Sequence, residues 1–97
     1  MKTLKKIKNL IEEKKDLLEK EYHVKRLGIF GSYAKQKAKK DSDIDIFVEF
    51  SETPDFFKFI ALEERLAEIL GSKVDLVTPK ALKPFIKNTI LRETIYI

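Results

Sequence analysis

Two aspartates two residues apart, Asp43 and Asp45, are the side chains in this sequence best suited to do chemistry. Both lie in the alternating segment 42–50, which predicts a strand with apolar residues on one face and the aspartates on the other. Two carboxylates on one face, with Cα atoms about 7 Å apart, repel each other unless a cation lies between them. Asp75, the only acid in a strand predicted over residues 73–77, adds a third ligand if that strand lies beside the second. An all-oxygen site of this kind suits Mg²⁺, and three carboxylates can hold two such ions for phosphoryl chemistry.

A glycine–serine pair, Gly31–Ser32, supplies groups of the opposite kind. It follows a short apolar strand predicted over residues 26–30 and opens a polar segment that predicts a short helix, residues 33–40. Backbone N–H groups at a helix start favour an anion, glycine permits close approach, and the Ser32 hydroxyl adds a donor. Lys35, with three more lysines in the segment, surrounds this route with positive charge, although such runs are more often solvated faces. Donors for phosphates beside carboxylates for metals together predict a nucleoside triphosphate site.

Composition removes several other kinds of site. The chain has 97 residues, which is enough for one small domain and too few for two. It has no cysteine and a single histidine, His23, so thiolate chemistry and multi-histidine metal sites are excluded. The net charge of +4 suits phosphate-bearing ligands but is too small to indicate a nucleic-acid partner. Because no apolar run approaches the length of a membrane span, we expect a cytoplasmic protein with no membrane partner.

The elements that must position these residues follow from hydrophobic spacing. Further helices are predicted over residues 4–22, from the start signal Thr53-Pro54-Asp55 to Leu70, and over residues 84–91. The tail, residues 94–97, is apolar and either adds to the sheet or meets a partner. The connection between the first two strands is scarcely long enough for a parallel crossover, which favours an antiparallel pair. We therefore predict one α/β (α+β) domain, residues 1–97, with a small mixed β-sheet packed by helices.

One arrangement of these motifs resembles a known signature. Phe30-Gly31-Ser32-Tyr33-Ala34, ten residues between Ser32 and Asp43, then Asp43-Ile44-Asp45-Ile46 and later Val74-Asp75-Leu76-Val77 resemble the minimal nucleotidyltransferase family of the DNA polymerase β-like superfamily. The resemblance implies a palm-like fold, with Asp43, Asp45 and Asp75 as catalytic Mg²⁺ ligands and Gly31–Ser32 at the triphosphate of ATP. It also implies a role as antitoxin to a HEPN-domain ribonuclease toxin, which some members neutralise by transferring AMP to a toxin tyrosine.

The sequence departs from the family pattern at one position. Lys35-Gln36 stands where relatives often have Arg-Gly, so a bidentate arginine contact becomes a point charge. We expect Lys35 to contact the nucleotide phosphates, with binding that is weaker or differently aimed. Larger nucleotidyltransferases attach a further domain that holds the acceptor. A chain of this size instead implies an acceptor that another protein supplies.

The same residues allow other interpretations. Asp43 and Asp45 can be solvated carboxylates on an edge strand, and with Asp41 and Glu52 they imitate a calcium-binding loop. That loop requires glycine where Ile46 stands, so it is rejected. A non-catalytic module that neutralises its partner by occlusion is indicated by the apolar C-terminal segment and the amphipathic first helix. A basic RNA-binding domain is the third alternative, and it predicts an affinity that falls steeply with salt.

Overall fold

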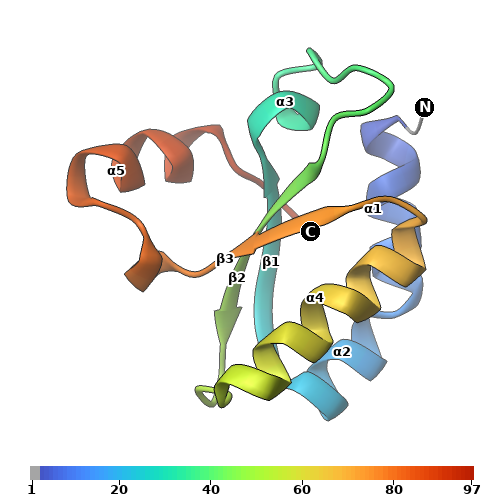
Figure 1. Cartoon of the computed structure of the whole chain (residues 1–97), viewed down its shortest axis with the longest axis vertical. Coiled ribbons are helices and arrows are strands. Elements are labelled where there is room, and N and C mark those ends of the chain that lie inside the picture. Colours follow the sequence, from blue (N-terminus) through green and yellow to red (C-terminus); the bar gives the residue numbers. More distant parts are fainter. Residues whose placement is uncertain (1–2) are drawn as a thin grey trace.

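A four-stranded mixed sheet with helices on both sides forms the structure, a computed structural model that describes residues 3–97 (Figure 1). The predicted fold class is confirmed. The elements in chain order are α1 (Leu4–Glu13), α2 (Lys15–Tyr22), β1 (Val24–Phe30), α3 (Gly31–Ala34), β2 (Ile44–Phe50), α4 (Phe56–Leu70), β3 (Val74–Val77), the 3-10 helix η1 (Pro79–Ala81), α5 (Pro84–Glu93) and β4 (Ile95–Tyr96).

The sheet has the strand order β3-β2-β1-β4. β1 is antiparallel to β2, as the short connection predicts, and α4 carries the chain across to β3, which is parallel to β2. The apolar tail forms β4 and pairs with β1, with Gly28 opposite Tyr96. Of the two predictions for this tail, the structure therefore confirms that it adds to the sheet. A Cβ at Gly28 would collide with the side chain of Thr94, which explains why glycine stands there.

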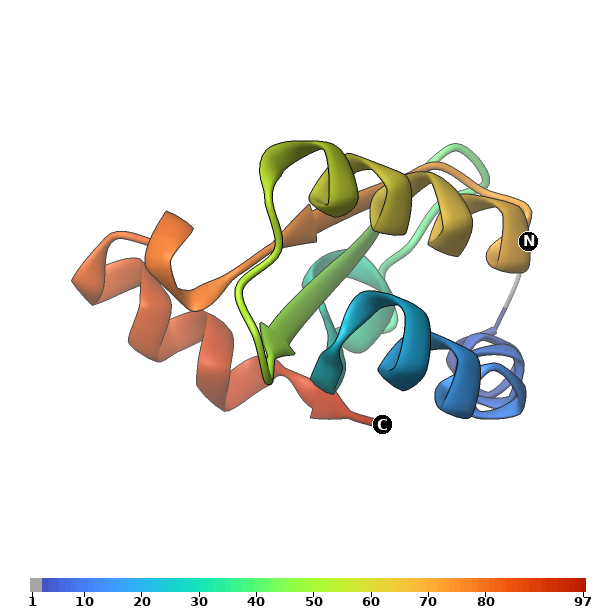
Figure 2. The same cartoon turned by 90° about the horizontal axis from the view of Figure 1, so that it is seen from below.

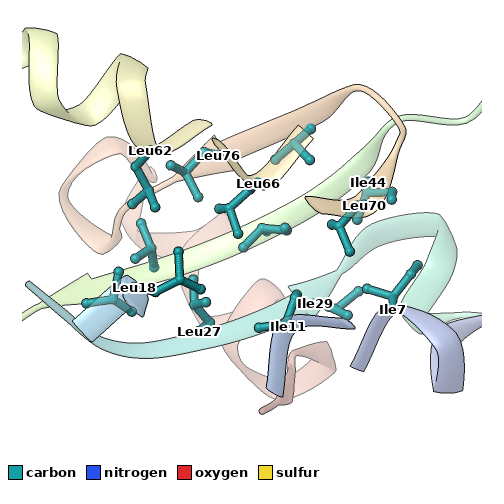
Figure 3. Packing of buried hydrophobic residues seen from close by; sticks show 14 of the residues in the cluster. Ile7, Ile11, Leu18, Leu27, Ile29, Ile44, Leu62, Leu66, Leu70 and Leu76 are labelled. Carbon is teal, nitrogen blue, oxygen red and sulfur yellow. The ribbon is translucent and has the colours of Figure 1, made fainter. Parts of the chain in front are cut away.

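One face of the sheet carries the core. Ile44, Ile46 and Val48 of β2 are fully buried on this face, which α1, α2 and α4 cover. Leu62, Leu66 and Leu70 recur every four residues along α4 and point into the same cluster (Figure 3). Each buried aliphatic side chain contributes about 1.5–3 kcal/mol, so this layer holds the sheet in place for the residues on its other face.

The single helix predicted over residues 4–22 is wrong at one point. The chain leaves helical geometry at Lys14, whose N–H donates to the carbonyl of Ile11 at 3.0 Å. The break separates α1 from α2 and lets both Ile11 and Leu18 bury almost completely. A continuous helical period describes each half but does not reveal the change of direction between them.

The helix predicted over residues 33–40 is also wrong over most of its length. α3 ends at Ala34, because Gln36 adopts a left-handed φ of 58° that a helix cannot continue through. Residues 37–43 instead form turns and irregular chain that lead into β2. The start of α4 differs slightly from its prediction: the Asp55 carboxylate accepts the N–H of Lys58 at 2.8 Å, so Asp55 is the N-cap and Pro54 precedes it.

Candidate active site

The three predicted acids lie together on the sheet face opposite the core. Asp45 pairs with Asp75 across the parallel β2–β3 ladder, and directly paired residues project to the same face. Asp43 lies just before β2, two residues from Asp45, and so shares that face. On its other side Asp45 pairs with Phe30, the last residue of β1. The starts of β2 and β3 and the end of β1 therefore place the carboxylates at one end of the strands.

Burial and two neighbouring acids change the pKa of Asp45. Its side chain is partly buried, and burial raises the pKa of Asp45 above its ordinary value. The negative charges of Asp75 and Asp43 raise the pKa further, in that order. A cation beside Asp45 would relieve both neighbouring repulsions, and the donor set is entirely oxygen, which fits Mg²⁺.

The three carboxylate groups nevertheless do not surround a common ion position in this structure. Within residues 3–97, no three acidic or histidine side chains are arranged as ligands of one ion. The shared face and the mutual repulsion fit the predicted metal ligands Asp43, Asp45 and Asp75, and holding an ion requires their side chains to turn toward each other.

Lys73 is a neighbour of the acids that the sequence did not predict. Its Nζ lies 3.9 Å from Oδ2 of Asp43, whose side chain is 45% exposed. The Lys73 carbonyl accepts the N–H of Ile44 at 2.9 Å, so the chain before β3 is fixed beside the start of β2. The only signal in the sequence is a lysine two residues before Asp75, which becomes meaningful once β3 is known to lie beside β2.

Gly31 brings the predicted phosphate turn against the acids. It has a left-handed φ of 72°, and a Cβ at this position would overlap the Asp45 carboxylate. Glycine is thus required both by the backbone and by the space, which joins the turn and the carboxylates into one site. Ser32 follows at the start of α3 and is partly buried, so the predicted Gly31–Ser32 pair lies beside the predicted metal ligands.

Lys35 is held between two elements at the edge of this turn. Its backbone N–H donates to the Gly31 carbonyl at 3.1 Å, and its Nζ lies 3.3 Å from Oε2 of Glu93 at the end of α5. The predicted phosphate ligand is therefore already paired with an acid. Glu93 was not predicted, because it lies two residues beyond the expected end of its helix and only the packing of α5 beside α3 brings it near.

Glu49 shares the strand face of the aspartates but has a structural partner. Its carboxylate accepts two hydrogen bonds from Arg26, each 2.9 Å, and the guanidinium also stacks 4.1 Å above the ring of Tyr96. Phe47 lies between Glu49 and Asp45 on this face and is fully buried. The ring of Tyr96 packs edge-on against it, with 6.4 Å between the ring centroids. β4 therefore closes the far part of the face, while the end that carries the acids is left more open.

The comparisons with known proteins agree with this geometry. Residues 6–97 match the family described as the nucleotidyltransferase domain. The protein adenylyltransferase MntA of Thermococcus cleftensis is 45% identical over 97 residues, which cover 100% of this chain and 98% of the relative. A Methanocaldococcus jannaschii protein, MJ0128, which bears a provisional name as a protein adenylyltransferase, is 49% identical over 98 residues and all of both chains.

Solved structures give the same result for the fold. A structure described provisionally as a minimal nucleotidyltransferase superposes with a TM-score of 0.83 and 31% identity, covering 97% of this chain and 95% of the other. A toxin–antitoxin structure with AMP-PNP superposes with a TM-score of 0.73 and 28% identity, covering 91% of this chain and 69% of that one. Both predictions from the motifs of this chain are confirmed, the resemblance to minimal nucleotidyltransferases and the assignment as an enzyme. The chain therefore belongs to the nucleotidyltransferase domain family.

Proposed function

We propose that this chain transfers AMP from ATP to a hydroxyl group of a partner HEPN-type toxin, and that it so acts as an antitoxin. The hydroxyl group that we propose as acceptor is that of a tyrosine. The observation that carries the proposal is the joint placement of Asp43, Asp45 and Asp75 against the Gly31 turn. The acceptor oxygen attacks the α-phosphorus of ATP, the bond from that phosphorus to the bridging oxygen breaks, and pyrophosphate leaves with the electron pair. The acceptor proton passes to the carboxylate of Asp75, which is exposed.

Each part of the site has a role in this reaction. The backbone N–H groups at Gly31–Ser32 bind the β- and γ-phosphates, and Lys35 adds positive charge beside them once it leaves Glu93. Asp43, Asp45 and Asp75 would hold Mg²⁺, which when bound supplies charge neutralisation at the phosphates. Holding the acceptor and ATP in one orientation accounts for much of the expected acceleration, because it removes the entropy of bringing them together.

The relatives support the chemistry and the partner. The name of the Thermococcus cleftensis relative is protein adenylyltransferase, and the solved structure with AMP-PNP is of a toxin–antitoxin pair. A second solved toxin–antitoxin complex, 26% identical to this chain with a TM-score of 0.69, is a mutant with two aspartates two residues apart changed to glutamate. That spacing is the spacing of Asp43 and Asp45.

Intact mass measurement tests the proposal directly. The chain is incubated with ATP, Mg²⁺ and the purified product of the neighbouring gene, tested as the HEPN-type toxin of this proposal, and that protein should gain one or more AMP units. The Asp43→Asn and Asp45→Asn double variant, folded as judged by circular dichroism, should add none. Equal transfer by this variant would refute the assignment of the acids.

A second candidate function is neutralisation by binding alone, with the nucleotide site regulatory or vestigial. The exposed apolar residues Phe85 and Ile86 at the start of α5 favour a surface that a partner covers. Toxin ribonuclease activity measured without ATP separates the two functions. Stoichiometric inhibition by wild type and by the aspartate double variant alike would favour occlusion over catalysis.

A further inference from the structure

α5 contributes no residue to the buried core. None of its ten residues is buried, and the side chains of Phe85 and Ile86 are 73% and 40% exposed. No side chain caps its N-terminus. In both views α5 stands apart from α1, α2 and α4 (Figures 1 and 2). A ten-residue helix is marginal in water by itself, so a molecule that covers the exposed side chains of Phe85 and Ile86 would stabilise α5.

The charge of this surface has one sign. Residues 79–92 include Lys80, Lys83, Lys87 and Arg92 and no acidic residue. The next acid along the chain, Glu93, is paired with Lys35. Exposed apolar side chains on a segment whose charges are all positive complement an apolar pocket that is rimmed by carboxylates.

The surface also adjoins the active site. At one end of α5 the Glu93–Lys35 ion pair, 3.3 Å long, connects the helix to the turn that carries Gly31. Beyond the other end, η1 borders an open groove of about 350 Å³ whose lining includes Phe50, Thr78, Pro79 and Lys80. The helix is about 15 Å long, so one protein domain docked on it reaches from the groove to the reacting groups.

We infer that η1 and α5, residues 79–92 (the α5 surface), bind the acceptor protein through an acidic patch with an apolar centre. The inference rests on the proposed function, since it names where the acceptor of that reaction docks. A second copy of the chain is a poorer occupant. A self-complementary contact would bring two cationic surfaces together, and like charges opposed across an interface weaken it.

RNA is the other macromolecule that a basic, aromatic surface suits. It is disfavoured because the exposed apolar group pairs one aromatic ring with an aliphatic side chain, Phe85 with Ile86, whereas binding of single strands relies on successive aromatic rings. RNA binding is therefore an outcome of the test that would contradict the inference.

The test compares two exposed apolar pairs on this chain. Phe85→Ser with Ile86→Ser removes the centre of the α5 surface. Phe56→Ser with Phe57→Ser is the matched control at the start of α4, where the side chains are 71% and 82% exposed and Asp55 is acidic. Both double variants should fold, since none of the four side chains is buried. Calorimetry measures binding of the HEPN-type partner used in the transfer experiment, without nucleotide, and steady-state transfer measures kcat and KM for toxin and for ATP.

We expect the α5 variant to weaken toxin binding by about tenfold or more and to raise the KM for toxin similarly, with the KM for ATP unchanged. The control should change each value by less than about twofold. Reversal of Lys83 and Lys87 to glutamate should weaken binding most at low salt. If toxin binds and the α5 variant loses binding while wild type transfers no AMP, the docking surface stands and the proposed reaction fails.

Other results would overturn the inference. These are equal effects of the two variants, toxin binding that neither variant changes, and no binding of the toxin by wild type. Self-association of wild type in light scattering that only the α5 variant loses would assign the surface to a second copy. Binding to a single-stranded RNA with a steep salt dependence, lost in the α5 variant while toxin binding persists, would assign it to RNA.

Discussion

The two faces of β2 differ in what they do for the molecule. On one face Ile44, Ile46 and Val48 are fully buried beneath three helices. On the other, burial and then two neighbouring carboxylates raise the pKa of Asp45, an arrangement that costs stability at neutral pH. One set of alternate residues therefore secures the fold, and the chemistry depends on the intervening set. Substitutions on adjacent residues of one strand should therefore separate stability from activity.

The largest expected effect comes from Asp45→Asn set against Ile46→Val. Loss of the Asp45 carboxylate should slow AMP transfer to the toxin on the order of a thousandfold, because the site loses charge that it needs in the transition state. Loss of one methylene from Ile46 should lower the free energy of unfolding by about 1 kcal/mol and leave kcat unchanged. Intact-mass kinetics and urea unfolding measure the two quantities. A large fall in kcat for folded Ile46→Val would break the separation between the faces.

A pair of glycines sharpens the comparison at the turn. Gly31 and Gly71 have left-handed φ values of 72° and 64°, so alanine at either position costs about 1 kcal/mol of backbone strain. Only at Gly31 does the added Cβ meet the Asp45 carboxylate. Gly31→Ala should therefore also reduce AMP transfer by about a hundredfold, the scale of a misplaced reacting group, while Gly71→Ala keeps wild-type kcat. Similar kcat values for the two variants would separate the turn from the site.

Local patterns in the sequence predict the parts of this molecule that depend on local rules. Strict alternation over residues 42–50 predicts β2, its two faces and the common side of Asp43 and Asp45. The short connection after Gly31 predicts the antiparallel pair. Each of these follows from side-chain period or chain length alone, and the structure confirms each.

Contacts between distant elements could not be predicted in the same way. The partners of Lys73 and Lys35 are set by where β3 and α5 pack, and hydrophobic period carries no information about that placement. The break at Lys14 and the left-handed Gln36 occur at residue types with no special preference for those conformations. The common face of the three acids was therefore predictable, whereas the ion pairs of Lys73 with Asp43 and of Lys35 with Glu93 were not.

Divalent ions should act on the acidic face alone. Binding of Mg²⁺ by wild type should raise the free energy of unfolding by about 1.4 kcal/mol at a tenfold excess of ion over its Kd, because the ion binds only the folded site. The Asp43→Asn and Asp45→Asn double variant should show no such rise. Thermal unfolding with MgCl₂ or with EDTA, at constant ionic strength, measures the difference. Equal stabilisation of both proteins would mean that the ion binds elsewhere.

The smallest expected effect is the pH dependence of stability in metal-free buffer. The pKa of Asp45 is raised in the folded state, so over the window above its unfolded value of about 3.9 the folded state holds more protons than the unfolded state. The contribution of Asp45 to stability then falls as pH rises through this window. Asn at position 45 removes the titrating group, so the advantage of Asp45→Asn should be least below about pH 4 and should grow toward neutral pH.

The size of this pH-dependent advantage should be about 1 kcal/mol or less at pH 7, since the carboxylate is partly open to solvent and screened. Urea unfolding of wild type and of Asp45→Asn with EDTA, between pH 3 and pH 7 at constant ionic strength, measures it. Glu49→Gln on the same strand face is the matched control. Because Glu49 is paired with Arg26, its loss should lower stability at neutral pH, the opposite sign from Asp45→Asn. If Asp45→Asn instead became less stable than wild type as pH rose, the carboxylates would be stabilised by their surroundings and the acidic face would carry no unfavourable charge for an ion to relieve.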